Sequence, residues 1–247
     1  MGDDIHEPSS ISPEPSTVVH RVVAILEVLL CSDYPTQLAL GASFTAFGYG
    51  PYVAGQLRLG YVVGISLADS VLLIGLVLLF LLAHGESPAE VLNGRRNVWR
   101  EFLAGIPMTF VALGIGIAVL GTIQFLAPRL HTVEHNPLQQ LLKSPTSIAL
   151  FACVVIFAGG VREEVQRAFL LHRFDRWLGG GRVGIVVTSI AFGSGHLLQG
   201  VDAAVATGLL GAFWGVIYLR RRSMVAPMVS HAGFDLLQIG QFLVVGK

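Results

Sequence analysis

Charged residues are scarce in this sequence. Asp, Glu, Lys and Arg make up 13% of the 247 residues, whereas soluble domains carry about a quarter. Hydrophobic residues make up 53%, and the mean hydropathy is +0.68. Because the surface of a water-soluble fold needs more polar side chains than this, the composition excludes that class. It predicts a chain whose outer surface faces lipid.

Cysteines are also few, and neither sign of charge is in excess. Cys31 and Cys153 lie among apolar residues without a ligand spacing, which favours packing roles over a disulfide or a metal site. The 16 acidic and 16 basic residues give a formal net charge of zero, so the chain lacks the basic footprint of nucleic-acid binding. We therefore expect no nucleic-acid partner.

The N-terminal stretch lacks the features of a signal peptide. Residues 1–17 are polar, contain three prolines and several acids, and have no basic segment followed by an apolar core. We predict a disordered tail here. Residues 18–247 are predicted to form a single membrane-embedded helical domain.

Seven apolar stretches follow, and most approach or exceed the roughly 20 residues that span a bilayer as a helix. They cover about 18–52, 61–83, 102–126, 147–174, 183–198, 203–218 and 225–245. No alternating barrel pattern is present, and helices satisfy their backbone groups locally in lipid. The predicted fold class is all-α, a polytopic transmembrane bundle of about seven helices. Glu27, Asp33 and Pro35 interrupt the first stretch, which is either one long broken helix or a helix plus an interfacial piece.

Basic residues are concentrated in alternate loops between these stretches. Three loops carry three arginines each: Arg95, Arg96 and Arg100; Arg173, Arg176 and Arg182; and Arg220, Arg221 and Arg222. The other loops are poorer in Lys and Arg. Cytoplasmic loops are enriched in these residues, so we expect the basic loops to be cytoplasmic. We expect an integral protein of the plasma (inner) membrane of a bacterium, with membrane lipids as partners.

Small residues form a stripe along the sixth stretch. Ala203, Thr207, Gly211 and Gly215 recur at intervals of four. Such stripes let helix backbones approach closely in membranes. The pattern predicts a helix in the middle of the bundle, with a packing role and no chemistry.

A dense charge cluster lies inside the fourth stretch. The segment 162–167 reads Arg-Glu-Glu-Val-Gln-Arg, and a charge within a membrane helix is costly and is a functional hypothesis by default. Glu163 and Arg167 are four residues apart and are predicted to pair on one helix face. Glu164 points about 100° away and is predicted to be free for another task. The alternative is an interfacial helix end that faces water.

Two histidines and an aspartate follow on later helices. His196 ends the fifth stretch, and His231 and Asp235 lie one turn apart in the seventh. A lone helical His is more often a packing residue, but these lie on separate membrane helices with the Glu pair. Imidazoles and carboxylates are the groups that a metal or a polarised water needs.

The order of these residues resembles that of the CPBP intramembrane proteases. This family includes the CAAX prenyl endopeptidases and bacterial relatives, some linked to bacteriocin self-immunity. Its pattern of Glu-Glu…Arg, Phe-xxx-His and His-xxx-Asn/Asp corresponds to Glu163 onward, to Phe192 with His196, and to His231 with Asp235. The resemblance covers about 155–237, within a predicted catalytic core at about 147–245.

The first motif departs from the family pattern. The family usually has Glu-Glu-x-x-x-Arg, but here Arg167 follows Glu164 after only two residues. If Arg167 is the anchor, Glu163 takes the place of the second family Glu and Arg162 replaces the first, which is usually assigned to catalysis. If the Glu pair is the anchor, Glu163 is the catalytic residue. The departure also admits a catalytically inactive member.

The resemblance implies hydrolysis of peptide bonds in membrane-associated, prenylated or leader peptides. A Glu would act as general base on a water, and Arg167 would position that Glu or stabilise developing negative charge. His196, His231 and Asp235 would hold a metal or the oxyanion. The cofactor is either zinc, bound by His196, His231 and Glu163, or none.

Other interpretations compete with this one. An inactive membrane scaffold of the same fold would not need either Glu. A proton-coupled transporter would also bury Glu and His, but no internal repeat or pair of broken helices is present. His131 to His135 spell the inverzincin motif H-x-x-E-H, yet they lie in a connector between prolines, which argues against a helix there. The acids Glu27, Asp33 and Asp69 are expected to be interfacial or to hydrogen-bond into the bundle, with no catalytic role.

Overall fold

The computed structural model describes residues 17–134 and 136–245, so the predicted tail falls almost wholly outside the described residues. The chain is helical almost throughout, which confirms the all-α class. Its α-helices are α1 (Thr17–Leu30), α2 (Tyr34–Ala46), α3 (Leu59–Ala83), α4 (Pro88–Asn93), α5 (Val98–Leu126), α6 (Pro145–Val154), α7 (Glu163–Trp177), α8 (Gly181–Ser194), α9 (Val201–Arg221) and α10 (Val225–Val245). Between α6 and α7 the chain continues as a π-helical segment, η3 (Val155–Arg162).

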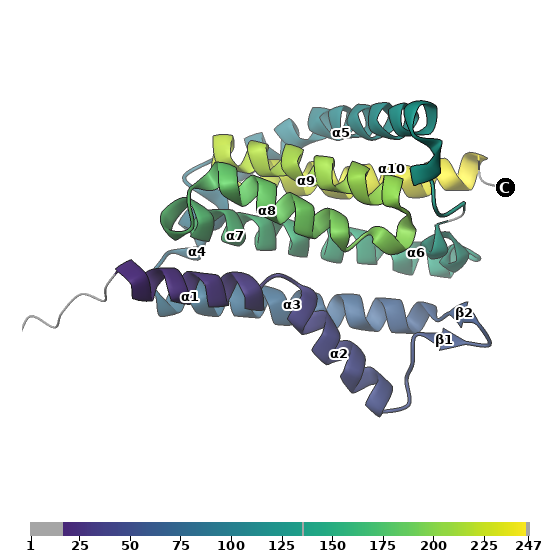
Figure 1. Ribbon diagram of the computed structural model, residues 1–247, viewed down its shortest axis with the longest axis horizontal. Coiled ribbons are helices and arrows are strands. Elements are labelled where there is room, and N and C mark those ends of the chain that lie inside the picture. Colours follow the sequence, from purple (N-terminus) through teal and green to yellow (C-terminus); the bar gives the residue numbers. More distant parts are fainter. Residues whose placement is uncertain (1–16, 135, 246–247) are drawn as a thin grey trace, which may run out of the picture.

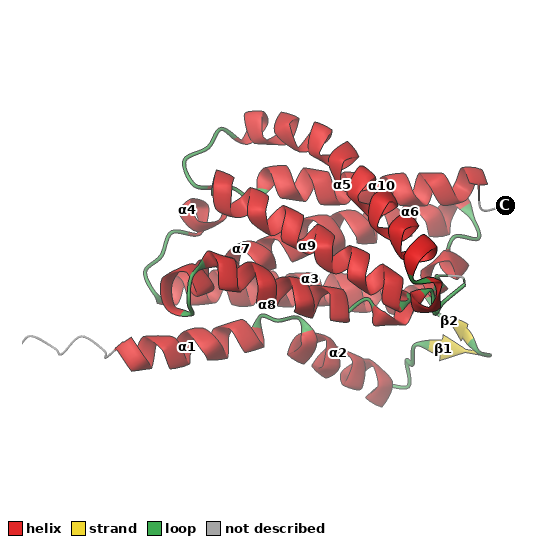
Figure 2. Cartoon of the chain, turned by 45° about the horizontal axis from the view of Figure 1, so that its top comes forward, coloured by secondary structure: helices red, strands yellow, loops and turns green. Residues whose placement is uncertain are grey.

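Two short strands form the sheet seen in the described residues. β1 (Tyr52–Val53) and β2 (Gln56–Leu57) pair as an antiparallel hairpin, with Tyr52 opposite Leu57. Figure 2 shows this hairpin in yellow beside an otherwise helical molecule.

The first apolar stretch is a helix followed by a second, shorter piece. α1 ends at Leu30 and α2 begins at Tyr34, with Pro35 in its first turn. Pro is tolerated there because its missing N–H has no helical partner in that turn. α1 and α2 have 14 and 13 residues, too few to span a bilayer as helices.

Among the residues that the structure describes, four helical segments are long and apolar enough to cross a membrane. They are α3, the segment Pro88–Leu126 that contains α5, α9 and α10; α8 is a shorter apolar helix. Large hydrophobic side chains point outward from these elements, among them Val71, Phe110 and Ile190. An integral membrane protein exposes such side chains to lipid, where a soluble protein would bury them.

The helices lie side by side along the long axis of the molecule (Figure 1). α1 and α3 form one side and α5 the opposite side, with α7 to α10 between them. α10 packs against α5 and η3, and α8 packs between α7 and α9. The predicted central position of α9 is confirmed by the close approach of α8 and α9: a Cβ at Gly193 would lie 2.6 Å from the carbonyl oxygen of Ala204.

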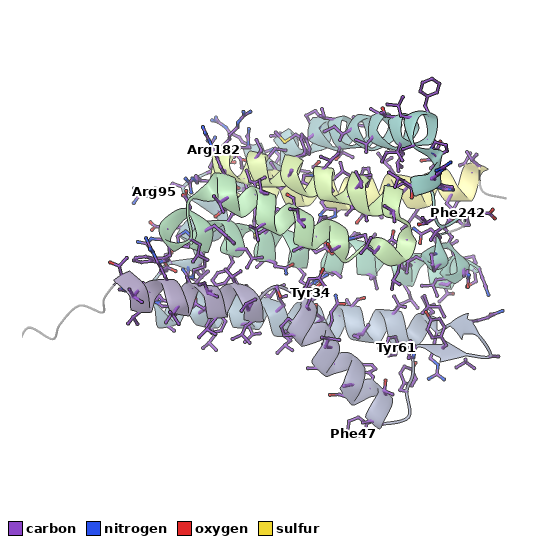
Figure 3. All side chains as sticks on the ribbon, viewed as in Figure 1. Tyr34, Phe47, Tyr61, Arg95, Arg182 and Phe242 are labelled. Carbon is purple, nitrogen blue, oxygen red and sulfur yellow. The ribbon has the colours of Figure 1, made fainter. Side chains whose placement is uncertain are left out.

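The two ends of the bundle differ in charge. Arg95 and Arg182 lie at the left end of Figure 3, and Phe242, near the end of α10, lies at the right. At the basic end, Arg96 donates to the backbone carbonyl of Arg221, and Arg222 pairs with Asp175 at 2.9 Å. The three arginine-rich loops therefore gather at one end, as one common cytoplasmic side requires. Which side of the membrane this end faces stays a prediction.

Candidate active site

Four of the six predicted site residues line one cavity of about 620 Å³ inside the bundle. α7 contributes Glu163, the turn after α8 contributes His196, and α10 contributes His231 and Asp235. The cavity also reaches the connector between α5 and α6 and the turn between α8 and α9, at the end away from the basic loops. A cavity with a few converging polar groups is the usual setting of a small-molecule or peptide site.

η3 and α10 approach each other closely beside this cavity. A Cβ at Gly160 would lie 2.7 Å from the Cβ of Ala232, and one at Gly159 would lie 2.7 Å from the Asp235 carboxylate. Glycine is required at both positions because a larger residue would push the helices apart. π-Helical turns are rare and occur frequently at functional sites. Here the turn brings the start of α7 next to His231.

Glu163 and Glu164 have opposite environments although they are adjacent. Glu164 is 1% exposed and accepts hydrogen bonds from Arg167 and from Nδ1 of His231, the latter at 2.8 Å. Glu163 accepts from Nη2 of Arg162 at 3.0 Å, and its Oε2 lies 3.7 Å from Nε2 of His231. Of the two carboxylates, Glu163 is the one that lines the cavity.

The predicted pairing of Arg167 with Glu163 is wrong. Arg167 pairs with Glu164, three residues earlier on the same helix. Its guanidinium lies 4.7 Å from the ring centre of Phe192 and 5.6 Å from that of Trp214. These rings of α8 and α9 draw Arg167 to the helix face that also carries Glu164, so Glu164 is not free for another task.

His231 is held in one orientation by its neighbours. Its Nδ1 faces the Glu164 carboxylate, which accepts hydrogen bonds, so Nδ1 carries the proton. The ring stacks on Trp214 with 3.8 Å between centroids. Nε2 is left facing Glu163 and Asp235, the latter at 3.8 Å. Both gaps are too long for a direct hydrogen bond and fit a bridging water.

His196 reaches the same cavity without joining this cluster. It lies in the turn after α8, and its Nδ1 is 2.9 Å from the carbonyl of Phe192 in that helix. A carbonyl accepts hydrogen bonds, so Nδ1 donates and Nε2 is the free ring nitrogen. Among the described side chains, His196 makes no hydrogen bond with Glu163, His231 or Asp235.

The predicted zinc ligands do not converge in this structure. Within residues 17–134 and 136–245, no three His, Cys, Asp or Glu side chains form a group that could hold a metal ion. Tetrahedral zinc needs three or four such ligands at about 2.0–2.3 Å from the ion. His196, His231 and Glu163 therefore do not fit zinc as they lie here.

The segment with the rival H-x-x-E-H motif has a different role. Residues 131–134 are not helical, and His135 lies outside the described residues. Nδ1 of His131 lies 2.7 Å from the Asp202 carboxylate, and Asn136 donates to Gln199 at 3.0 Å. These contacts fasten the connector to the start of α9 and to the turn before it, beside the cavity.

Four residues near the site were not among the predicted site residues. Trp214 packs on His231, and Arg162 pairs with Asp33, Asp69 and Glu163. Trp214 lies in α9, and the small residues of this helix predicted only a packing role for it. The cost of burying charge singled out the two aspartates, but the identity of their partner depends on how distant helices pack.

The fold and the exposed apolar surface define an integral membrane protein, and the cluster around His231 is a candidate hydrolytic site. Residues 144–237 match the family model described as type II CAAX prenyl endopeptidase Rce1-like. This segment contains all six predicted site residues, and the match supports the resemblance to the CPBP family of intramembrane proteases that the motifs indicated. The match supports a CAAX-type protease in general; neither it nor the geometry supports a metalloprotease. No curated protein and no solved structure matches the chain.

Proposed function

We propose that this chain is an intramembrane endopeptidase in which Glu163 is the general base. One observation carries the proposal: Oε2 of Glu163 and Oδ2 of Asp235 lie 3.7 and 3.8 Å from Nε2 of His231 on the wall of one cavity. A water bound among these atoms would face the cavity. General-base catalysis needs a base within hydrogen-bond reach of the proton that it removes.

The reaction follows from this arrangement. Glu163 takes a proton from the water while the water oxygen bonds to the carbonyl carbon of the scissile peptide. His196, on the wall of the same cavity, stabilises the oxygen that becomes negative. When the carbon–nitrogen bond breaks, Glu163 returns its proton to the leaving amine. The products are a carboxylate and an amine.

Glu164 and Arg167 act through His231. Glu164 accepts a hydrogen bond from Nδ1–H of His231, and in the neutral ring this tautomer leaves Nε2 able to accept a hydrogen bond from the water. Arg167 neutralises the buried Glu164 charge, which would otherwise be costly. The preferred substrates are membrane-associated peptides, either prenylated or leader-type, because the cavity also has apolar walls from α3, α5 and α10.

The test is cleavage of fluorogenic peptides by the purified protein in lipid vesicles. We expect His196→Ala and His231→Ala each to abolish cleavage while the protein still inserts and folds. His20→Ala is the matched control, because His20 stacks on Trp177 at the start of α1 and is absent from the cavity wall. Activity that survives both cavity substitutions would overturn the proposal. If a zinc chelator abolishes wild-type activity and added zinc restores it, the reaction requires a bound metal.

A further inference from the structure

Arg162 is the centre of a second charge cluster next to Glu163. It is the last residue of η3 and is buried, and its Nε lies 3.3 Å from the carbonyl of Ala158. Nη2 contacts Oε1 of Glu163 at 3.0 Å. Nη1 pairs with Asp33 and lies 3.1 Å from Oδ2 of Asp69. One guanidinium group therefore pairs with three carboxylates.

Asp69 has little reason to be buried for stability alone. It lies in the middle of α3 and is 1% exposed. Neither carboxylate oxygen has a hydrogen-bond partner that meets normal geometry among the described residues. A buried ion pair is weak evidence for stability, since desolvation offsets the attraction. A functional explanation for Asp69 is therefore favoured.

Asp33 is held in a strained conformation at the break between α1 and α2. Its φ is 79°, a region that residues with a Cβ seldom adopt and that clusters at functional sites. Gln37 donates to Oδ2 of Asp33 at 2.7 Å, and Gln166 of α7 donates to the carbonyl of Cys31 at 2.8 Å. These bonds fix the break against the helix that carries Glu163.

Both aspartates contact Nη1 of Arg162, and this decides how Arg162 can hold Glu163. An arginine with a single carboxylate partner tends to form a bidentate pair that occupies both oxygens. Such a pair would take Oε2 of Glu163 away from the cavity. Because Asp33 and Asp69 occupy Nη1, Arg162 holds Glu163 through Nη2 and Oε1 alone.

We propose that Asp33 and Asp69 are positioning residues for the reaction, acting through Arg162. By sharing its guanidinium they keep Oε2 of Glu163 directed at His231 and the cavity. This inference rests on the proposed role of Glu163. It gives the N-terminal helices, which lie outside the matched segment 144–237, a part in the active site.

The experiment compares kcat and KM of Asp69→Asn and Asp33→Asn with wild type, per folded molecule in lipid vesicles. We expect kcat to fall about 10- to 100-fold, the range that a misplacement of about 1 Å can cost. KM should stay unchanged, because neither residue lines the cavity. In an Arg162→Gln background, Asp69→Asn should lower kcat no further, since residues that act through one partner are not additive.

Glu101→Gln is the matched control. Glu101 is 2% exposed and pairs with Arg221 near the basic end, away from the cavity. It should lower stability as Asp69→Asn does but leave kcat unchanged. If both aspartate variants keep wild-type kcat while Glu163→Gln is inactive, the positioning role is overturned and the proposed function stands. If Glu163→Gln keeps its activity, the proposed function fails and the positioning role with it.

Discussion

At the scale of single residues, the contrast between Glu163 and Glu164 defines the site. Two adjacent carboxylates, about 100° apart on a helix, meet different neighbours. Glu164 is enclosed by Arg167 and His231, and Glu163 meets Arg162 and the cavity. When environments separate two carboxylates in this way, they can take different chemical roles.

Glu86, in the loop after α3, gives a prediction about pH and stability. Burial raises its pKa, but hydrogen bonds from His172 and Arg173 outweigh burial and lower the pKa from 4.5 to about 2. A carboxyl with a lowered pKa stabilises the fold when ionised. Its contribution is therefore full above about pH 4.5 and is lost as the pH falls towards 2.

Thermal unfolding of wild type and Glu86→Gln between pH 2 and 7 measures this contribution. We expect the variant to unfold at a lower temperature above pH 4.5, with the difference vanishing near pH 2. Glu90→Gln is the control. The ion pair between Glu90 and Arg95, with 3.5 Å between its atoms, is exposed to solvent, and exposed pairs contribute little to stability. A difference that stays constant down to pH 2 would contradict the role given to Glu86.

Sequence reasoning predicted which residues lie together in the fold better than it predicted their contacts. Motif order and the cost of buried charge singled out Glu163, His196 and His231, and all three line one cavity. The partner of Arg167 was predicted wrongly, because Phe192 and Trp214, on helices that follow later in the chain, decide where its guanidinium lies.

At the scale of the helices, two close approaches place the site. η3 meets α10 at Gly159 and Gly160, and α8 meets α9 at Gly193 and Gly208. The small-residue stripe predicted the second approach, since it is a property of sequence spacing. The π-helical turn was not predicted, because it depends on what α10 presents to η3.

Gly193→Ala tests the α8–α9 approach. The added Cβ would lie 2.6 Å from the carbonyl oxygen of Ala204, so the helix must shift, which costs about 1–3 kcal/mol as overpacking does. We expect a lower unfolding temperature and a lower kcat, because His196 follows Gly193 by three residues, in the turn just after α8. Gly75→Ala is the control, since nothing lies within 4 Å of its added Cβ. Equal behaviour of the two variants would show that the approach does not place His196.

At the scale of the whole molecule, charge and cavity lie at opposite ends. The arginine-rich loops gather where α7 ends and α8 begins, and the cavity reaches the connector near the end of α10. The predicted orientation therefore places the cavity mouth on the non-cytoplasmic side. Hydropathy predicted the helical class and most helix positions. It left open the break at Asp33, which is fixed by contacts with η3 and α7.

The most direct test of the whole proposal is the cleavage rate of a membrane peptide by Glu163→Gln compared with Glu164→Gln and wild type. Loss of a general base typically costs about 10²- to 10⁴-fold in rate. We expect Glu163→Gln to lose at least 100-fold with unchanged KM and an intact fold. Glu164→Gln should lose stability as well as rate, because it leaves Arg167 unpaired in the core. Wild-type cleavage by Glu163→Gln would contradict the assignment of Glu163 as the base. Biological complementation by the Glu163→Gln, Glu164→Gln double variant, in the absence of cleavage, would favour an inactive scaffold of the same fold.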